Sequence, residues 1–252
     1  TYTGTTTASG GALGAGSDTA FGAGSLTILN ATIFAYGADR TFSLAVSEAN
    51  STGAVATFAG DYSLTFNGAW TNGTTSASGR FLRNNIVSGK TLTINGDYTF
   101  NAVTTGTNMN FDGSGDTIIN GIISNTLATM GITYVGTGSL TLGGANTYNG
   151  ATNVSNGVLK LGADGVIPDG TGKGNVAINP AVGVTATLDL NGKSETINGL
   201  TANGAGTAII DNTSGTAASL TFGANDQVVN IGGLGNYTIT DSGAGSLSIT
   251  KT

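Results

Sequence analysis

The sequence contains no cysteine and no histidine, and these two absences exclude several kinds of chemistry. Without cysteine the chain can form no disulfide and has no thiolate nucleophile or thiolate metal ligand. Without histidine it lacks the most common general base and the most common transition-metal ligand. The composition therefore argues against an enzyme that depends on these groups.

Charged residues are also scarce. Lys and Arg number 8 and Asp and Glu number 14 among 252 residues, which gives a formal net charge of -6. Such a chain does not offer the basic surface that nucleic acid attracts. No apolar run approaches the roughly 18 residues that a membrane-spanning helix needs. We therefore expect no nucleic-acid partner and no transmembrane segment in this sequence.

Proline occurs only twice, whereas 43 residues are glycine. Glycine costs about 1 kcal/mol at each interior helix position relative to alanine, and Thr, Ser, Asn and Val also disfavour helix. Short runs of Val, Ile, Thr, Phe and Tyr are bounded by Asn-Gly, Gly-Gly and Asp-Gly, which favours strands joined by tight turns. The composition predicts an all-β protein.

A short motif, apolar then polar then apolar, recurs along the chain and is often followed by Gly or Asn-Gly. Alternation places the two apolar side chains on one face of a strand and the central residue on the other. Lys160 and Asp189 occupy the central position, so we expect that position to face solvent. A charge at Leu140 or Leu188 should then unfold neighbouring coils, whereas Lys160→Glu should be nearly silent. The motif lies at 26–28, 64–66, 92–94, 118–119, 140–142, 159–161, 188–190, 220–222 and 247–249.

Successive motifs are separated by roughly 20 to 30 residues, the length of one coil of a parallel β-helix. At about 22 residues per coil the chain would make about 11 coils. The crossover rule gives such a helix a right hand. The predicted fold class is therefore a single-stranded right-handed parallel β-helix, or β-solenoid.

Longer phrases also recur. Residues 136–142 are similar to 22–28 and 243–249, and residues 147–152 are similar to 1–6. No Pro-rich or charged linker interrupts the chain. We expect one continuous rod over 1–252, built from two related repeat modules at about 1–146 and 147–252, with no separate domain.

The phrase at 136–162 runs Gly-Thr-Gly-Ser-Leu-Thr-Leu, then Gly-Ala-Asn-Thr-Tyr-Asn-Gly, and closes on Gly-Val-Leu-Lys-Leu-Gly. In this order it resembles the autotransporter-associated β-strand repeat, and 188–200 and 18–26 are similar to other parts of that family. The resemblance implies a β-helical passenger of an exported bacterial protein, secreted or displayed on the cell surface. It implies no catalytic residue and no cofactor.

No capping signature is visible at either end of the sequence, and both ends fall within repeat phrases that complement each other. Nor does the sequence end in the outer-membrane barrel of the family. The open strand edges of a β-helix pair readily with another chain. The expected partner is therefore a second copy, stacked head to tail through uncapped ends, or the chain belongs to a longer tandem array.

Asp112 and Asp116 flank a Gly-rich turn of the kind that suits Ca²⁺. The rest of an EF-hand is missing, because Ile123 stands where the bidentate Glu would be. The tandem repeat of Ca²⁺-binding β-rolls is missing as well. A solvated turn is the favoured interpretation, and no metal site is assigned.

Paired acids are a second kind of candidate, because parallel β-helices can host polysaccharide-active enzymes that use two carboxylates. The candidates are Asp189, Asp211 and Asp226, none of which lies in a distinctive motif. No catalytic residue is assigned from them.

The third candidate is basic and aromatic: Arg80-Phe81-Leu82-Arg83 with Trp70 nearby. It could bind an anionic or carbohydrate ligand, although a loop pinned to the rod with its arginines in water is favoured. Tyr2 and Tyr148 are expected to stack within the repeat. The Asn-x-Ser/Thr matches at Asn30, Asn72 and Asn236 are expected by chance in such a chain.

These observations predict a non-enzymatic structural protein that forms an extracellular or cell-surface rod, stacked end to end into a filament or part of a longer array. The alternative is an adhesin passenger that binds host or matrix glycans or proteins through loops such as the one around Arg80. A polysaccharide-active β-helix enzyme is the remote third possibility.

Overall fold

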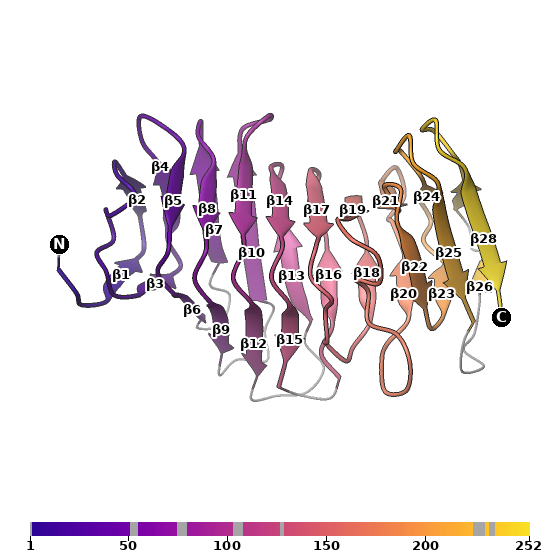
Figure 1. The fold of residues 1–252 in the computed structure, drawn as a ribbon, viewed down its shortest axis with the longest axis horizontal. Coiled ribbons are helices and arrows are strands. Elements are labelled where there is room, and N and C mark those ends of the chain that lie inside the picture. Colours follow the sequence, from indigo (N-terminus) through magenta and orange to yellow (C-terminus); the bar gives the residue numbers. More distant parts are fainter. Residues whose placement is uncertain are drawn as a thin grey trace.

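The computed structural model of the chain describes residues 2–50, 55–74, 80–102, 108–126, 129–223, 230–231 and 235–252. Every regular element in these ranges is a β-strand. The strands lie side by side along one long axis, from the N-terminus at one end to the C-terminus at the other (Figure 1). All the strand pairs are parallel. The predicted all-β parallel solenoid is therefore confirmed.

The strands form four sheets, which we call A to D. Sheet A has six strands: β1 (Thr6–Ser9), β3 (Leu26–Leu29), β6 (Val46–Asn50), β9 (Trp70–Thr74), β12 (Tyr98–Ala102) and β15 (Ile123–Asn125). Sheet B has ten: β2 (Ala12–Ala15), β4 (Thr32–Ala35), β7 (Val55–Gly60), β10 (Arg80–Ile86), β13 (Met109–Asp112), β16 (Ile132–Tyr134), β18 (Thr152–Val154), β20 (Val176–Ile178), β23 (Leu200–Ala202) and β26 (Asn230–Ile231).

Sheet C has nine strands: β5 (Arg40–Phe42), β8 (Leu64–Phe66), β11 (Thr91–Ile94), β14 (Asp116–Ile119), β17 (Ser139–Leu142), β19 (Gly157–Leu161), β21 (Thr185–Asp189), β24 (Thr207–Asp211) and β27 (Asn236–Ile239). Sheet D has three: β22 (Ser194–Ile197), β25 (Ala218–Phe222) and β28 (Leu247–Lys251). Most coils contribute one strand to sheet B and one to sheet C. The third side is sheet A in the N-terminal coils and sheet D in the C-terminal coils.

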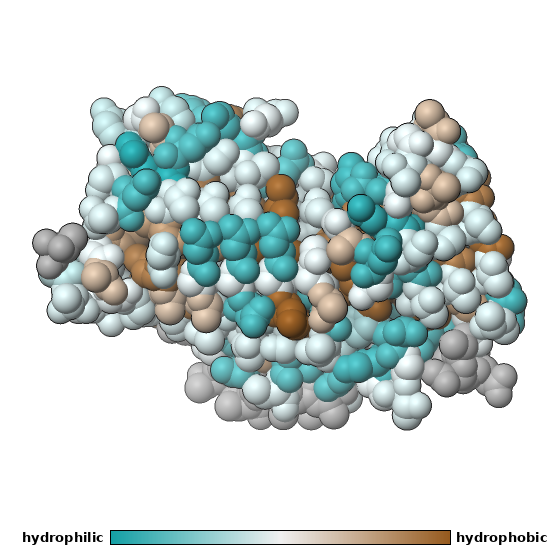
Figure 2. All heavy atoms as spheres, viewed as in Figure 1, coloured by the Kyte–Doolittle hydropathy of each residue, from teal (hydrophilic) through white to brown (hydrophobic). Residues whose placement is uncertain are grey.

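The interior is apolar, as alternation requires. Buried side chains alternate with half-buried or exposed ones along most strands, for example in β8 and β11. In the N-terminal half the filling is aromatic, and each ring contacts the next with centroids 4.7 to 6.0 Å apart. This row is formed by Phe21, Phe42, Phe66, Trp70, Tyr98 and Phe111. The exterior seen in Figure 2 is mainly polar or weakly polar, with small apolar patches.

The repeated strand motif stacks as predicted only in the middle of the chain. In sheet C, Leu64 lies opposite Leu92, and Leu140, Leu159 and Leu188 follow one another in register. The motif at 26–28 lies instead in sheet A, and those at 220–222 and 247–249 lie in sheet D. The motifs therefore do not all lie on one side of the rod, because the same strand-plus-turn phrase can form a strand of sheet A, C or D.

The motif expected at 118–119 is shifted by one residue. Leu92 lies opposite Thr117, whose side chain is buried, whereas Ile118 is only half-buried on the outer face. The buried Thr117 hydroxyl accepts a hydrogen bond from Asn84 Nδ2 at 3.2 Å, which offsets the cost of its burial. The expected number of coils was also too high, since the longest sheet, with one strand per coil, has ten described strands.

The glycine that follows the strand motif is required by close backbone approach. A Cβ at Gly96 would lie 2.0 Å from the carbonyl oxygen of Gly68, and one at Gly121 would lie 2.0 Å from that of Gly96. Gly144 continues the column, with 2.4 Å to the oxygen of Gly121. At this corner any side chain would prevent successive coils from stacking at hydrogen-bonding distance.

The two faces of β17 make a first prediction about stability. Leu140→Ala removes a fully buried side chain and should lower the free energy of unfolding by about 2–5 kcal/mol. Thr141→Ala, one residue along on the outer face, should change it by less than about 0.5 kcal/mol. Urea unfolding of both variants checks this, and equal losses would contradict the assigned facing.

Candidate functional site

The acidic side chains serve mainly to join one coil to the next. In three cases an Asp carboxylate accepts hydrogen bonds from both the backbone N–H and the hydroxyl of one residue in the following coil, at 2.5 to 3.1 Å. These pairs are Asp116 with Ser139, Asp189 with Thr213 and Asp211 with Ser242. Four further aspartates accept a backbone N–H of the following coil without a hydroxyl donor: Asp18 from Thr41, Asp39 from Ser63, Asp97 from Ile122 and Asp164 from Ser194. Asp39 also accepts from Lys90 Nζ at 3.0 and 3.1 Å.

The turn expected as the best metal candidate has its carboxylates occupied by protein groups. Asp112 accepts from Arg83 Nε at 2.8 Å and Nη2 at 2.5 Å, and from the N–H of Gly113 at 2.6 Å. Asp116 bonds to Ser139. Within the described ranges, no three acidic side chains gather closely enough to hold a metal ion. The geometry at this turn supports an ion pair and a cap between coils.

The basic-aromatic candidate is dispersed by the fold. A loop was expected at residues 80–83, but these residues form the first part of strand β10 in sheet B. Trp70 lies in sheet A, fully buried, and its indole contacts Phe66 and Tyr98 inside the rod. Trp70 therefore cannot stack on a ligand beside Arg83, as the alternative interpretation required. The favoured interpretation, a loop pinned to the rod, is wrong because these residues belong to a strand.

Of the three aspartates considered for catalysis, the structure brings two together. Asp189 and Asp211 are in register at the ends of β21 and β24, and Asp226 lies outside the described residues. Asp189 was expected in solvent but is only 2% exposed, because the segment that carries Thr213 covers it. Its Oδ2 lies 3.4 Å from Lys160 Nζ. Both carboxylates are engaged by backbone and hydroxyl donors, so the pair does not have the free acid and base of a glycosidase.

The burial of Asp189 overturns the expectation that Lys160→Glu is silent. The substitution places a second carboxylate beside a buried one, so it should lower the free energy of unfolding. We expect about 1–2 kcal/mol, less than for a fully buried pair, because the partly exposed position of Lys160 lets solvent screen the repulsion. Lys251→Glu, at an exposed position, is the matched control. Thermal and urea unfolding measure both changes, and a silent Lys160→Glu would contradict the ion pair.

A carboxylate lies inside the rod, at a position that the sequence analysis did not single out. Glu48 in β6 is fully buried, and it accepts hydrogen bonds from Trp70 Nε1 at 2.8 Å, Asn72 Nδ2 at 2.6 Å and Tyr98 OH at 3.1 Å. Burial raises its pKa to about 7, against the lowering effect of these three donors. The Oδ1 atom of Asn72, also buried, has no hydrogen-bond partner among the described residues. A protonated Glu48 adds one O–H donor to this cluster, in which Asn72 Oδ1 is the acceptor that lacks a partner among the described residues.

A second buried glutamate lies under the loop between β19 and β20. Glu195 in β22 is 3% exposed, and its Oε2 accepts from the N–H of Val166 at 2.9 Å. Burial raises its pKa to about 7, with a further small increase from the charge of Asp169. Glu195 therefore anchors the loop, and it lies far from Glu48 in sequence and in sheet order.

The two glutamates predict that the protein loses stability as the pH rises from 5 to 8. Their pKa is about 7 in the folded chain and 4.5 as the ordinary value, so in this window the folded state holds protons that the unfolded state has released. The stabilisation that comes from these two bound protons is complete below pH 4.5, and it is lost as the pH rises through the folded-state pKa of about 7. At about 1.4 kcal/mol per pKa unit, each group accounts for on the order of 3 kcal/mol.

Urea unfolding at half-unit pH steps measures this slope. Glu48→Gln should remove about half of it, whereas Asp97→Asn, which alters an exposed cap, should leave it unchanged. The carboxyl group of Asp39 has a lowered pKa, mainly through the N–H of Ser63, and acts only at more acidic pH. A flat profile between pH 5 and 8 would contradict the assignment.

The repeated tyrosine phrase forms the same local contact twice. Tyr148 OH lies 2.6 Å from Thr152 Oγ1 and is fully buried, and Tyr2 OH contacts Thr6 Oγ1 in the same way. Tyr2 is 52% exposed because β1 is the first strand of its sheet. Among the Asn-x-Ser/Thr matches, Asn72 is buried and inaccessible, whereas Asn236 is exposed.

Next to Tyr148, one buried amide bridges coils on the side where the rod has no strand. Sheet A ends at β15 and sheet D begins at β22, and the segment 143–151 lies between them. Asn146 accepts a hydrogen bond from the N–H of Ile123 at 2.7 Å and donates one to the carbonyl oxygen of Val166 at 2.7 Å. On this side of the rod, its side chain thus supplies hydrogen bonds to the preceding and the following coil in place of a backbone ladder.

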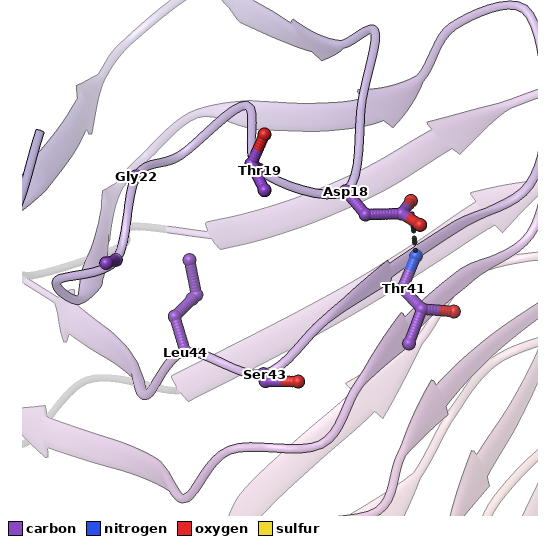
Figure 3. A pocket seen from close by; sticks show the side chains of 7 residues that line it. Asp18, Thr19, Gly22, Thr41, Ser43 and Leu44 are labelled. Carbon is purple, nitrogen blue, oxygen red and sulfur yellow. Dashed lines mark hydrogen bonds between the residues drawn. The ribbon is translucent and has the colours of Figure 1, made fainter. Parts of the chain in front are cut away.

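A groove of about 420 Å³ lies near the N-terminal end of the rod. Figure 3 shows its lining, in which Asp18 faces the backbone of Thr41 and Leu44 supplies the apolar wall. The remaining lining residues are small, and the only ionisable side chain is the Asp18 carboxylate, which already accepts the Thr41 N–H. This groove has no pair of groups for acid-base or nucleophilic chemistry.

Comparison with known families identifies one segment. Residues 132–161, which contain β16 to β19 with Asn146 and Tyr148 between them, match the family model described as the passenger-associated-transport-repeat. The resemblance read from the sequence at 136–162 is therefore confirmed for this segment. No curated protein and no solved structure matches the chain. Within the described residues no helix has the length and apolar character to cross a membrane.

Proposed function

We propose that this chain, a parallel β-solenoid in which residues 132–161 form a passenger-associated-transport-repeat, is a non-enzymatic structural rod that is secreted or displayed on a bacterial surface. One observation carries the proposal. The polar side chains that could have served chemistry are instead used between coils, as Asp116, Asp189 and Asp211 show. Their role favours a rod that acts through its shape.

The strand edges at the two ends of the rod favour stacking. Among the described residues, β1, β2 and β5 pair on one side only, and so do β26, β27 and β28 at the other end. A parallel β-strand from a further coil would satisfy each row of free N–H and C=O groups. In the purified chain these further coils would come from another copy, which gives a head-to-tail contact that does not close.

One substitution can block this contact without removing an existing backbone hydrogen bond. The N–H of Thr252 donates to the carbonyl oxygen of Phe222, so alternation turns the N–H of Lys251 toward the open edge of β28. Lys251→Pro removes that donor, whereas Lys251→Ala keeps it.

We expect negative-stain electron microscopy of the purified chain to show filaments that lengthen with concentration, and to show the same for Lys251→Ala. Lys251→Pro should give short rods at every concentration. Short rods for all three proteins would refute end-to-end assembly while leaving the solenoid rod itself in place. Filaments for Lys251→Pro would show that stacking does not use β28.

The adhesin alternative needs a surface that recognises a ligand, and the basic-aromatic loop first considered for it does not form. The enzyme alternative finds no unengaged acid pair in the described residues at Asp189 and Asp211. Neither alternative is favoured by the sites that the sequence suggested.

A further inference from the structure

A second groove, of about 350 Å³, lies at the corner where β4 and β7 end. Its walls include the aromatic residues Phe34, Tyr36 and Tyr62, its floor includes Gly37 and Gly60, and one acidic residue, Asp61, faces it. Aromatic walls with a single acceptor differ from the rest of the outer surface, where Thr, Ser and Asn prevail.

The aromatic walls are built on glycine. Phe34 lies in register with Gly14 of β2, and a Cβ at Gly14 would come within 2.6 Å of the Phe34 ring. On the other side a Cβ at Gly60 would come within 3.3 Å of Phe34 Cβ. Glycine on both neighbouring strands thus leaves room for a large ring on the outside of sheet B.

Tyr36 is held by its backbone while its side chain remains free. Its N–H donates to the carbonyl oxygen of Ala15 at 2.9 Å, and its own carbonyl oxygen accepts from Arg40 Nη2 at 2.7 Å. The side chain is nevertheless 70% exposed. A ring fixed at its base and open to solvent can bind a ligand with little loss of backbone entropy.

Asp61 differs from the aspartates that join the coils. Seven of those carboxylates accept a backbone N–H from the next coil, whereas Asp61 is exposed and makes no hydrogen bond or ion pair with a described residue. The nearby guanidinium of Arg40 is engaged with the carbonyl oxygens of Ala15 and Tyr36. The groove therefore presents one free, uncompensated acceptor.

We propose that this groove binds a pyranose unit of a neutral glycan. The C–H face of the sugar packs on the Tyr36 ring, and sugar hydroxyls donate to the Asp61 carboxylate. An anionic glycan is disfavoured, because the free carboxylate repels it and the whole chain carries a formal charge of -6. The site goes beyond the structural role and does not depend on whether rods stack.

The test is a titration of the whole chain with neutral hexasaccharides of glucose, mannose and galactose, and with hexagalacturonate as the anionic probe, followed by calorimetry. We expect at least one neutral probe to bind at millimolar concentration or below, and hexagalacturonate not to bind. Tyr36→Ala should weaken binding about tenfold, and Asp61→Asn by a smaller factor. Tyr2→Ala, which removes another exposed tyrosine outside the groove, should leave binding unchanged.

The thermal unfolding midpoint of each variant establishes that it folds. The proposal is overturned if none of the neutral probes binds, if hexagalacturonate binds as well as they do, or if Tyr36→Ala and Tyr2→Ala have equal effects.

Discussion

The structure depends on one constraint: each coil must lie at hydrogen-bonding distance from the next along its whole length. In a parallel ladder this distance is about 4.8 Å, so a residue that suits one coil must also suit the same place in its neighbours. The glycine column from Gly68 to Gly144 and the leucines of sheet C follow from it. So does the outer amide ladder, in which Asn120 donates to Asn95 and Asn95 donates to Asn67, at 2.8 and 2.7 Å.

The same constraint explains why seven aspartates at corners accept backbone N–H groups of the next coil. At a corner the backbone leaves the ladder, and an N–H of the next coil would lack an acceptor. A short carboxylate one coil earlier is at the right distance to accept it, as Asp189 does for Thr213. Asn146 also joins coils, on the third side of the rod where no strand is present. Its amide oxygen accepts from the coil before, and its amide nitrogen donates to the coil after.

Much of this could be predicted from the sequence, because alternation and turn residues are local signals. The all-β solenoid, the inward leucines at 140 and 159 and the repeat at 136–162 all followed from them. Three things did not. Which side of the coil a motif occupies depends on loop lengths, so the sequence did not show that Leu26 and Leu247 lie in sheets A and D rather than in sheet C. The segment that covers Asp189 comes from the next coil, which local signals do not reveal. The inward direction of Glu48 follows only from alternation with Val46, and a charged residue at such a position is not ordinarily expected inside.

Positions that depart from the columns of equivalent residues in successive coils need an explanation other than stacking. A rod needs only uniform columns, and a buried carboxylate such as Glu48 lowers stability near neutral pH, where burial opposes its charge. A free acid and an exposed ring at one corner, Asp61 beside Tyr36, add nothing to the stacking of coils. Stability does not explain the exposed ring and free acid at this corner, whereas the proposed glycan site gives both residues a role. The groove at Tyr36, on the outside of the rod, is accessible to a partner, whereas Glu48 is closed to one.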